Sequence, residues 1–306
     1  MNSSTLAVLS ALAAFGPAPV PVAAPPSAPI ALAAPQAPGR DYVLAPAGRE
    51  VPRDAFYDAL MSARVICVGE KHDEASQHLA QAEAVAQVAE RDPVVVVGLE
   101  MVSQDQQPIL DGFLSGRTSE TEFAAWWNKT WGFDYSMYKP IFDVARARRL
   151  RMVGLNAPIG LVVAVARHGL SSLTPAERAQ LPASIAESSD ARYRGYVQSE
   201  LVGHHLPPDA LARMIEAQSV WNETMGAKAA ELAASSRVLV LAGQGHMLWG
   251  AGIPESARRR GVAAAAVALP YPLDGAAKSS AEELARLRDP KTDDLALADG
   301  FILIPR

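Results

Sequence analysis

Three uninterrupted apolar runs, each followed by a histidine or a glutamate, constrain the fold of this chain more than any other feature. They occupy residues 65–68, 94–99 and 238–242. The first and third lead into Gly-x-x-His motifs that end at His72 and His246, and the second leads directly into Glu100. Continuous runs of valine, isoleucine and leucine are typical of strands buried on both faces, as in parallel sheets. Ligands of such sheets bind beyond the carboxyl ends of the strands, so we expect a single cleft there.

The side chains expected in this cleft are two carboxylates and two imidazoles, from Glu70, His72, Glu100 and His246. Glycines at the strand ends permit tight turns, so Glu70 and His72 can face the cleft together. Imidazole and carboxylate groups can hold a divalent cation or carry out general acid–base chemistry. Taken singly, each residue has an alternative role as a helix cap, an ion-pair partner or a hydrogen-bonding group for a loop. Their placement at the ends of three strands favours a shared functional pocket.

Strands and helices alternate over much of the chain. The expected helices cover residues 74–90, 104–115, 119–129 and 138–149, and further strands cover 152–155, 262–268 and 301–304, the last as an edge strand. In the first helix the apolar stripe comprises Ala75, Leu79, Ala82 and Ala86. The alternation predicts an α/β fold with a central, mainly parallel β-sheet flanked by helices. We expect one domain over 41–306, interrupted over about 158–234 by a helical insertion with helices near 158–168, 174–180, 190–202 and 208–234.

The last helix of the insertion places two amides on an otherwise apolar face. Leu211, Ile215, Gln218, Trp221, Asn222 and Met225 follow one another at spacings of three and four and therefore share a face. Buried amides need hydrogen-bond partners, which the carboxylates and imidazoles of the cleft could supply. Alternatively, this face packs on the core, and Gln218 and Asn222 lie at its solvated margin.

An aromatic cluster precedes Pro140 and comprises Trp126, Trp127, Trp131, Phe133, Tyr135 and Tyr138. Such clusters usually form core, but aromatic rings beside phenols also suit a flat ligand such as haem, because tyrosine can ligate ferric iron. On that interpretation Tyr135 lines the pocket together with Gln218 and Asn222. Tyr193, Tyr196, His204 and His205 lie in the insertion and could serve the same purpose.

Residues 1–40 differ in composition from the rest of the chain, with no charged residue before Arg40. The apolar stretch from Leu6 to Phe15 has the length of a signal-peptide core and is too short to span a bilayer. We expect an exported protein with a Pro-rich linker over 17–40; the alternative is a disordered Ala/Pro leader. The net charge of −5 argues against bulk nucleic-acid binding. The single cysteine, Cys67, excludes an internal disulfide and is expected to be a buried thiol.

Several ordered motifs resemble the ChaN family of haem-binding uptake proteins, within the larger group that includes erythromycin esterases and the Tiki and TraB proteins. The similarity runs from about Arg64 to Gly261, over Val68–Asp73, Gly98–Met101, Gln104–Pro108, Trp131–Tyr135, Tyr138–Phe142, Gly154–Pro158, Ala217–Met225, Ala242–His246 and Gly252–Pro254. The resemblance implies a bacterial haem or iron uptake or storage system, with a haem-uptake receptor or transporter as possible partner. It also implies a homodimer in which two haems stack between subunits, with tyrosine as iron ligand.

For that role the resemblance leaves several candidates here, namely Tyr138 and Tyr193, supported by His204 or His205. Some family members are lipoproteins, whereas the leader here contains no cysteine, so we expect a soluble periplasmic or secreted protein without a lipid anchor. Asn222 occupies a position where related sequences tend to carry aspartate. This substitution removes one negative charge from any metal or acid–base site.

The relationship to the Tiki and TraB proteins implies a second hypothesis, a hydrolase. In its metal-dependent form His72, His246 and Glu100 bind a divalent cation such as Mn, Co or Zn, and Glu70 activates water. The esterase-like members imply a form without metal, in which histidine acts as general base. A third hypothesis retains the cleft without catalysis and assigns binding to the helical insertion.

Overall fold

An eight-stranded sheet with the strand order β2-β1-β8-β7-β3-β6-β4-β5 organises the chain. The computed structural model describes residues 41–202, 206–272 and 280–304. The strands are β1 (Tyr42–Leu44), β2 (Arg49–Val51), β3 (Val65–Glu70), β4 (Val96–Ser103), β5 (Arg151–Asn156), β6 (Val238–Gly243), β7 (Ala265–Pro272) and β8 (Gly300–Ile304). The six strands from β8 to β5 pair in parallel, and only β1 and β2 add antiparallel pairs. The predicted α/β class with a mainly parallel sheet is confirmed.

The apolar runs form the centre of this sheet, as their composition predicts. Every residue of β3, β4 and β6 is buried, in keeping with strands covered on both faces. Cys67 in β3 is fully buried, and desolvation raises the pKa of its thiol to about 12. The strand near the carboxyl terminus, β8, is not at the edge as expected, because the unpredicted strands β1 and β2 extend the sheet beyond it.

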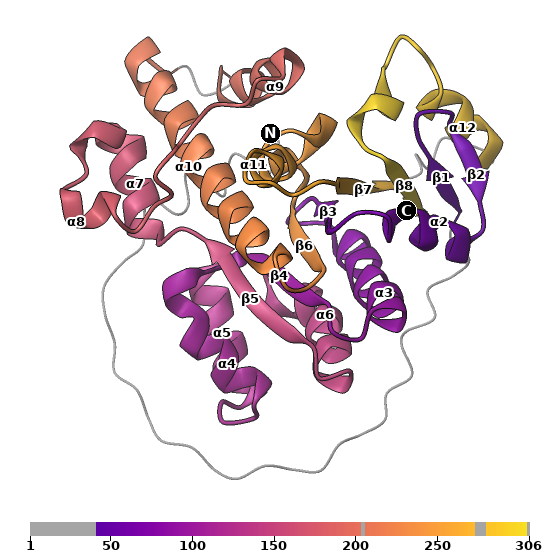
Figure 1. The fold of residues 1–306 in the computed structure, drawn as a ribbon, viewed down its shortest axis with the longest axis horizontal. Helices are drawn as coiled ribbons and strands as arrows, with labels where there is room; N and C mark the ends of the chain where they lie inside the picture. The colour runs from indigo at the N-terminus through magenta and orange to yellow at the C-terminus, as the bar shows by residue number, and fades with distance from the viewer. Residues whose placement is uncertain (1–40, 203–205, 273–279, 305–306) are drawn as a thin grey trace.

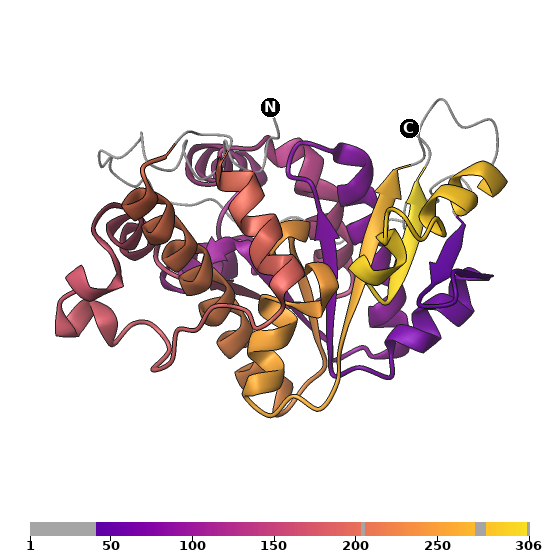
Figure 2. The same ribbon diagram turned by 90° about the horizontal axis from the view of Figure 1, so that it is seen from above.

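Helices cover both faces of the sheet (Figures 1 and 2). One face carries α2 (Arg53–Leu60), α3 (Ala75–Arg91), α4 (Gln107–Leu114), α5 (Glu120–Thr130) and α6 (Tyr135–Ala147). The other carries α9 (Ala191–Val202), α10 (Pro208–Ala233), α11 (Ile253–Arg259) and α12 (Ser280–Leu287). None of the helices within the described ranges is long and apolar enough to cross a membrane.

Helix α3 buries only half of the stripe that its sequence suggests, because Ala82 and Ala86 are buried but Ala75 is exposed. Leu79 is exposed, whereas Gln77, His78 and Gln81 are buried. Gln81 donates a hydrogen bond to the Val68 carbonyl oxygen, and Nε2 of His78 lies 3.2 Å from the His72 carbonyl oxygen. This helix therefore supports the end of β3 with polar contacts, which an apolar pattern cannot reveal.

The segment expected as a helical insertion contains α7 (Ile159–His168), α8 (Pro175–Arg178), α9 and α10, gathered at the end of the molecule opposite β1 and β2 (Figure 1). Helix α10 runs across the sheet and packs closely on α11, because Gly226 has no side chain. A Cβ at Gly226 would lie 2.4 Å from Ser256 Oγ. Beside this contact, the buried Glu223 forms ion pairs with Arg259 and Arg260.

Candidate functional site

The parallel register brings the two Gly-x-x-His motifs to the same edge of the sheet. Strands β3 and β6 are neighbours, and Glu70 pairs with Gly243 across them. Strand β4 lies on the other side of β6 and carries Glu100. Glu70, His72, Glu100 and His246, expected to meet at the strand ends, are all buried there. We call these four residues the Glu–His cluster.

Glu70 and His72 form the first pair of the cluster. Nδ1 of His72 lies 2.5 Å from Oε1 of Glu70, and Oε2 of Glu70 is buried without a hydrogen-bond partner in the described part of the chain. The imidazole is covered by Trp131 and Phe133, at ring-centroid distances of 4.9 and 5.2 Å. Two half-exposed aromatic rings therefore separate His72 from solvent.

Glu100 and His246 form the second pair. Oε1 of Glu100 lies 3.1 Å from Nε2 of His246, and Oε2 accepts a hydrogen bond of 2.5 Å from the Gly243 amide. The two pairs approach each other at Gly243, where a Cβ would lie 2.8 Å from Cε1 of His72 and 3.5 Å from Oε2 of Glu100. Only glycine fits between them.

The charges of the cluster keep the imidazole of His72 protonated and the carboxyl group of Glu100 ionised at neutral pH. Burial lowers the pKa of His72, but the charges of Glu70 and Glu100 and the hydrogen bond to Glu70 outweigh it and raise that pKa to about 9. Burial also raises the pKa of Glu100, but His246, His72 and the Gly243 amide together lower it to about 2. At neutral pH His72 is an imidazolium that donates to Glu70, and Glu100 is a carboxylate.

The two amides on α10 join the second pair, as one of the two interpretations of that helix predicts. Nδ1 of His246 lies 2.7 Å from Oδ1 of Asn222 and 3.1 Å from Nε2 of Gln218. Both ring nitrogens of His246 therefore have protein partners. Within the described ranges no group of three or more His, Cys, Asp or Glu side chains is arranged to hold a metal ion.

Tyr193 belongs to the same network, a role that differs from the iron ligation that the family resemblance implies for it. Its hydroxyl donates to the Gly245 carbonyl at 2.7 Å and accepts from Nδ2 of Asn222 at 2.9 Å. Burial raises the pKa of this phenol to about 12, so it is protonated at neutral pH. No sequence pattern signals this contact, because it depends on how α9 lies across α10.

The aromatic cluster before Pro140 is mostly core, and its two tyrosines lie apart from the amides of α10. Tyr138 is fully buried; its hydroxyl accepts from Nε1 of Trp131 and donates to the His72 carbonyl. Tyr135 packs among Phe113, Phe123 and Trp127 on the α3 side of the sheet. The expectation that Tyr135 lines a pocket with Gln218 and Asn222 is therefore corrected, because the sheet separates them.

Two further candidates, His204 and His205, lie outside the described residues. Tyr196, on α9, is half-buried and packs near Tyr193 and Trp249. Its hydroxyl lies close to the Gly245 backbone, 3.2 Å from the position of a Cβ there, and it has no hydrogen-bond partner among the residues that the structure describes. Trp249 has a left-handed backbone (φ 57°), which is rare for an aromatic residue.

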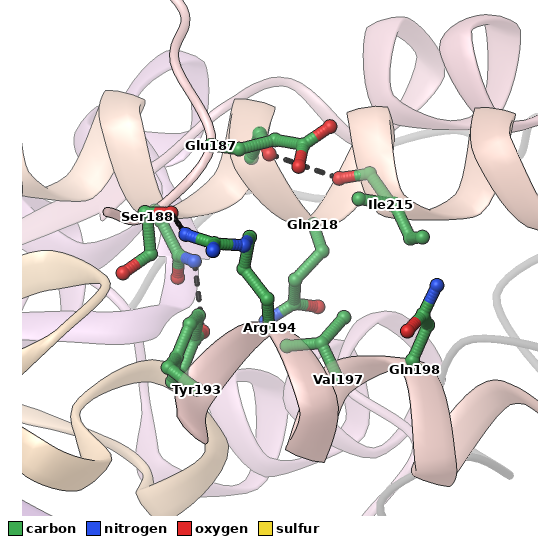
Figure 3. Close-up of a pocket in the computed structure, with 10 residues that line it drawn as sticks. Glu187, Ser188, Tyr193, Arg194, Val197, Gln198, Ile215 and Gln218 are labelled. Atoms are coloured by element: carbon green, nitrogen blue, oxygen red, sulfur yellow. Dashed lines mark hydrogen bonds between the residues drawn. The ribbon is translucent and has the colours of Figure 1, made fainter. Parts of the chain in front are cut away.

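A cavity of about 210 Å³ lies between α9 and α10, next to the amides that bond His246 (Figure 3). Helix α9 contributes Tyr193, Arg194, Val197 and Gln198, and α10 contributes Ile215, Gln218, Ser219 and Asn222. Glu187 and Ser188, from the segment before α9, complete the lining. Through Tyr193, Gln218 and Asn222 the cavity adjoins the second pair of the Glu–His cluster.

The chain is similar to known proteins in sequence and in fold. A family described as "Haem-binding uptake, Tiki superfamily, ChaN" matches residues 56–256. The fold is similar to that of a structure described as cofacial heme binding to ChaN of Campylobacter jejuni, with a TM-score of 0.65 and 17% identity over 87% of this chain and 96% of that one.

More distant similarities involve an erythromycin esterase variant and a type III effector. The esterase, EreC in its open conformation, has a TM-score of 0.47 and 13% identity over 82% of this chain and 92% of its own. The effector, HopBA1, has a TM-score of 0.44 and 12% identity over 81% and 90%. No curated protein sequence matches the chain significantly.

Proposed function

The chain belongs to the ChaN family of haem-binding uptake proteins in the Tiki superfamily, and from this premise we propose that it binds haem in a bacterial haem or iron uptake or storage system. The observation that carries the proposal is the family match over residues 56–256. This range includes Tyr196, whose hydroxyl has no hydrogen-bond partner among the residues that the structure describes. A bound ferric haem supplies an iron that a tyrosine oxygen can ligate.

We place the iron ligand on α9. Tyr138 is enclosed and its hydroxyl has two partners, so access to it would require the aromatic cluster to open. The Tyr193 hydroxyl is also engaged twice, with Gly245 and Asn222. The Tyr196 hydroxyl has no hydrogen-bond partner within the described ranges. Of these three tyrosines, Tyr196 can therefore bind iron without breaking an existing hydrogen bond of its hydroxyl. Tyr193 supports it from the preceding turn of the same helix.

The size of the α9–α10 cavity supports a second subunit at the haem. At about 210 Å³ it is below the roughly 300–1,000 Å³ of pockets that enclose drug-sized ligands. A porphyrin ring held by α9 would therefore extend beyond this cavity, where a second copy of the chain could contact it. In our proposal a second copy of the chain makes this contact, which gives a homodimer when haem is bound. The composition of residues 1–40 supports export to the periplasm or beyond.

Hemin titration followed by absorbance tests the proposal. We expect the wild type to give a Soret band, and Tyr196→Phe to shift it and to weaken binding by at least about tenfold, because the phenolate oxygen is lost. Burial raises the pKa of Tyr196, so iron must displace its proton, and affinity for hemin should rise with pH. Light scattering should show dimers on loading.

The control is Tyr138→Phe, which removes a phenol of the same kind that lies in the buried aromatic cluster. We expect it to leave the Soret band unchanged. A wild type that binds no hemin contradicts the proposed function. An unchanged spectrum in Tyr196→Phe contradicts only the assignment of the ligand, and the same comparison with Tyr193→Phe then tests the other tyrosine of α9.

The Glu–His cluster supports a second candidate function, hydrolysis by acid–base chemistry. The observation that favours it is Oε2 of Glu70, a buried carboxylate oxygen without a hydrogen-bond partner in the described part of the chain, which could accept from a water or a substrate group. We favour the form without metal, because both nitrogens of His246 are already bonded to Glu100 and to the amides of α10. In this form His72 gives and takes the proton that it shares with Glu70.

Hydrolysis of p-nitrophenyl acetate and p-nitrophenyl butyrate tests the second candidate. We expect His72→Gln to lower the protein-dependent rate by about a hundredfold or more, the usual loss for a general acid–base residue. His168→Gln is the control, because His168 is exposed at the end of α7. If wild type and His72→Gln hydrolyse these esters at the same rate, the cluster is not hydrolytic.

A further inference from the structure

Iron ligation by Tyr196 assigns no role to the cavity between α9 and α10. Its lining combines one guanidinium and several amides with the apolar side chains of Val197 and Ile215 (Figure 3). Arg194, which supplies the guanidinium, lies in the same helix as Tyr196 and two residues before it. Residues two apart in a helix project from different sides of it, but the ring of Tyr193, which lines the cavity, lies 6.4 Å from the ring of Tyr196, so a haem held by Tyr196 would lie beside this cavity.

The guanidinium of Arg194 is fixed in place from one side. Its Nη1 donates to the carbonyl oxygens of Ser188 and Ser189, each at 2.8 Å. Both serines are held in turn by Glu255, which accepts from Ser188 Oγ at 2.5 Å and from the Ser189 amide at 2.9 Å. Loss of side-chain freedom on ligand binding is therefore reduced, because Arg194 is already ordered.

The other side of the same guanidinium is available to a ligand. Nε and Nη2 of Arg194 donate to no residue in the described ranges, although a guanidinium carries five N–H donors in a planar fork. This fork matches the two oxygens of a carboxylate. Gln198, from the next turn of α9, adds an amide donor to the same lining.

We propose that this cavity binds the carboxylate of a short carboxyalkyl chain, with Arg194 as its charged partner, and that a haem propionate is the chain that occupies it. The identification of haem rests on the proposed function. The volume of about 210 Å³ excludes a porphyrin ring but admits an arm of this size. Val197 and Ile215 contact the methylene groups of the arm, and the carboxylate reaches Arg194.

One negative charge lines the cavity and opposes such a ligand. Glu187 is exposed, so water screens its carboxylate. Its removal is therefore expected to strengthen carboxylate binding modestly, whereas removal of Arg194 weakens it. Opposite effects from these two residues distinguish an electrostatic anchor from a general disturbance of α9.

The experiment compares hemin with the dimethyl ester of hemin, which has the same ring and iron but no free carboxylate. We expect Arg194→Gln to weaken hemin binding by about tenfold, the range of a charge-assisted hydrogen bond, and to leave binding of the diester unchanged. Glu187→Gln should strengthen binding of hemin only. Arg213→Gln, which makes the same charge change on α10 outside the cavity lining, should bind both as the wild type does.

Equal losses for hemin and diester in Arg194→Gln, or no loss for either, overturn the propionate anchor. A wild type that binds neither porphyrin contradicts the proposed function, and sodium butyrate then tests the cavity on its own. A Tm raised by butyrate relative to sodium chloride in the wild type but not in Arg194→Gln identifies a site for free carboxylates. No such rise overturns the carboxylate site as well.

Discussion

Replacing Glu100 by alanine is expected to lower the free energy of unfolding by about 3–5 kcal/mol, the usual cost of removing one partner from a buried ion pair. Glu100 is almost fully buried, and its two oxygens bond His246 and the Gly243 amide. The variant leaves both of these groups, and the nearby imidazolium of His72, without the acceptor that they face. Urea unfolding of wild type and variant measures the difference.

The control for this prediction is Glu120→Ala, which removes the same charge from an exposed ion pair with Lys139 and should lower the free energy of unfolding by less than about 1 kcal/mol.

The ionised carboxylate of Glu100 is also expected to make the stability of the protein fall at acid pH. Its pKa is lowered to about 2, so the stability that it contributes is present above its ordinary pKa of 4.5 and is lost as pH falls towards 2. Equal stabilities of Glu100→Ala and wild type at neutral pH contradict this account of the cluster.

The wild type is expected to lose up to about 3 kcal/mol of stability between pH 6.5 and pH 9 through His72 alone. The pKa of His72 is raised from 6.5 to about 9 in the folded state. A raised pKa means that the folded state binds the proton more tightly than the unfolded state does. The stabilisation is therefore complete below pH 6.5 and disappears as pH rises through 9.

Unfolding curves across this pH range, for wild type and for His72→Gln, measure the effect. The variant should be less stable than the wild type at pH 6. Its free energy of unfolding should also change less between pH 6.5 and 9, because it lacks the titrating imidazole. His168→Gln keeps His72 and should follow the wild type. A wild-type stability that does not change between pH 6.5 and 9 is incompatible with a proton shared between Glu70 and His72.

The sheet and the Glu–His cluster could be predicted from the sequence because both depend on short, local signals. The apolar run before His72 is long enough to identify a buried strand, and a motif that follows such a strand lies at its carboxyl end. The parallel register then brings Glu70 and Gly243 opposite each other without any further information. Helical periodicity places the two amides on one face of α10 but leaves open whether they contact the cluster or solvent.

The parts that could not be predicted depend on how distant elements lie against one another. The hydrogen bond from Tyr193 to Gly245 requires α9 to cross the turn that follows β6. The buried face of α3 mixes polar and apolar side chains, since Gln81 bonds the backbone of β3 and Leu79 is exposed, while Ala82 and Ala86 are buried as expected. Strand β1 pairs with β8 from the opposite end of the chain. In each case tertiary contacts outweigh local propensity.

The hydrogen bonds of Glu100 have an evolutionary consequence. Because this carboxylate joins β4 to the Gly243 amide of β6 and to His246, it contributes to folding whether or not the cluster catalyses a reaction. A descendant that lost every enzymatic activity would still be under purifying selection at this position, since most proteins tolerate the loss of only a few kcal/mol. Selection for a stable fold alone would therefore be sufficient to retain Glu100 and its partner His246, whatever the protein binds.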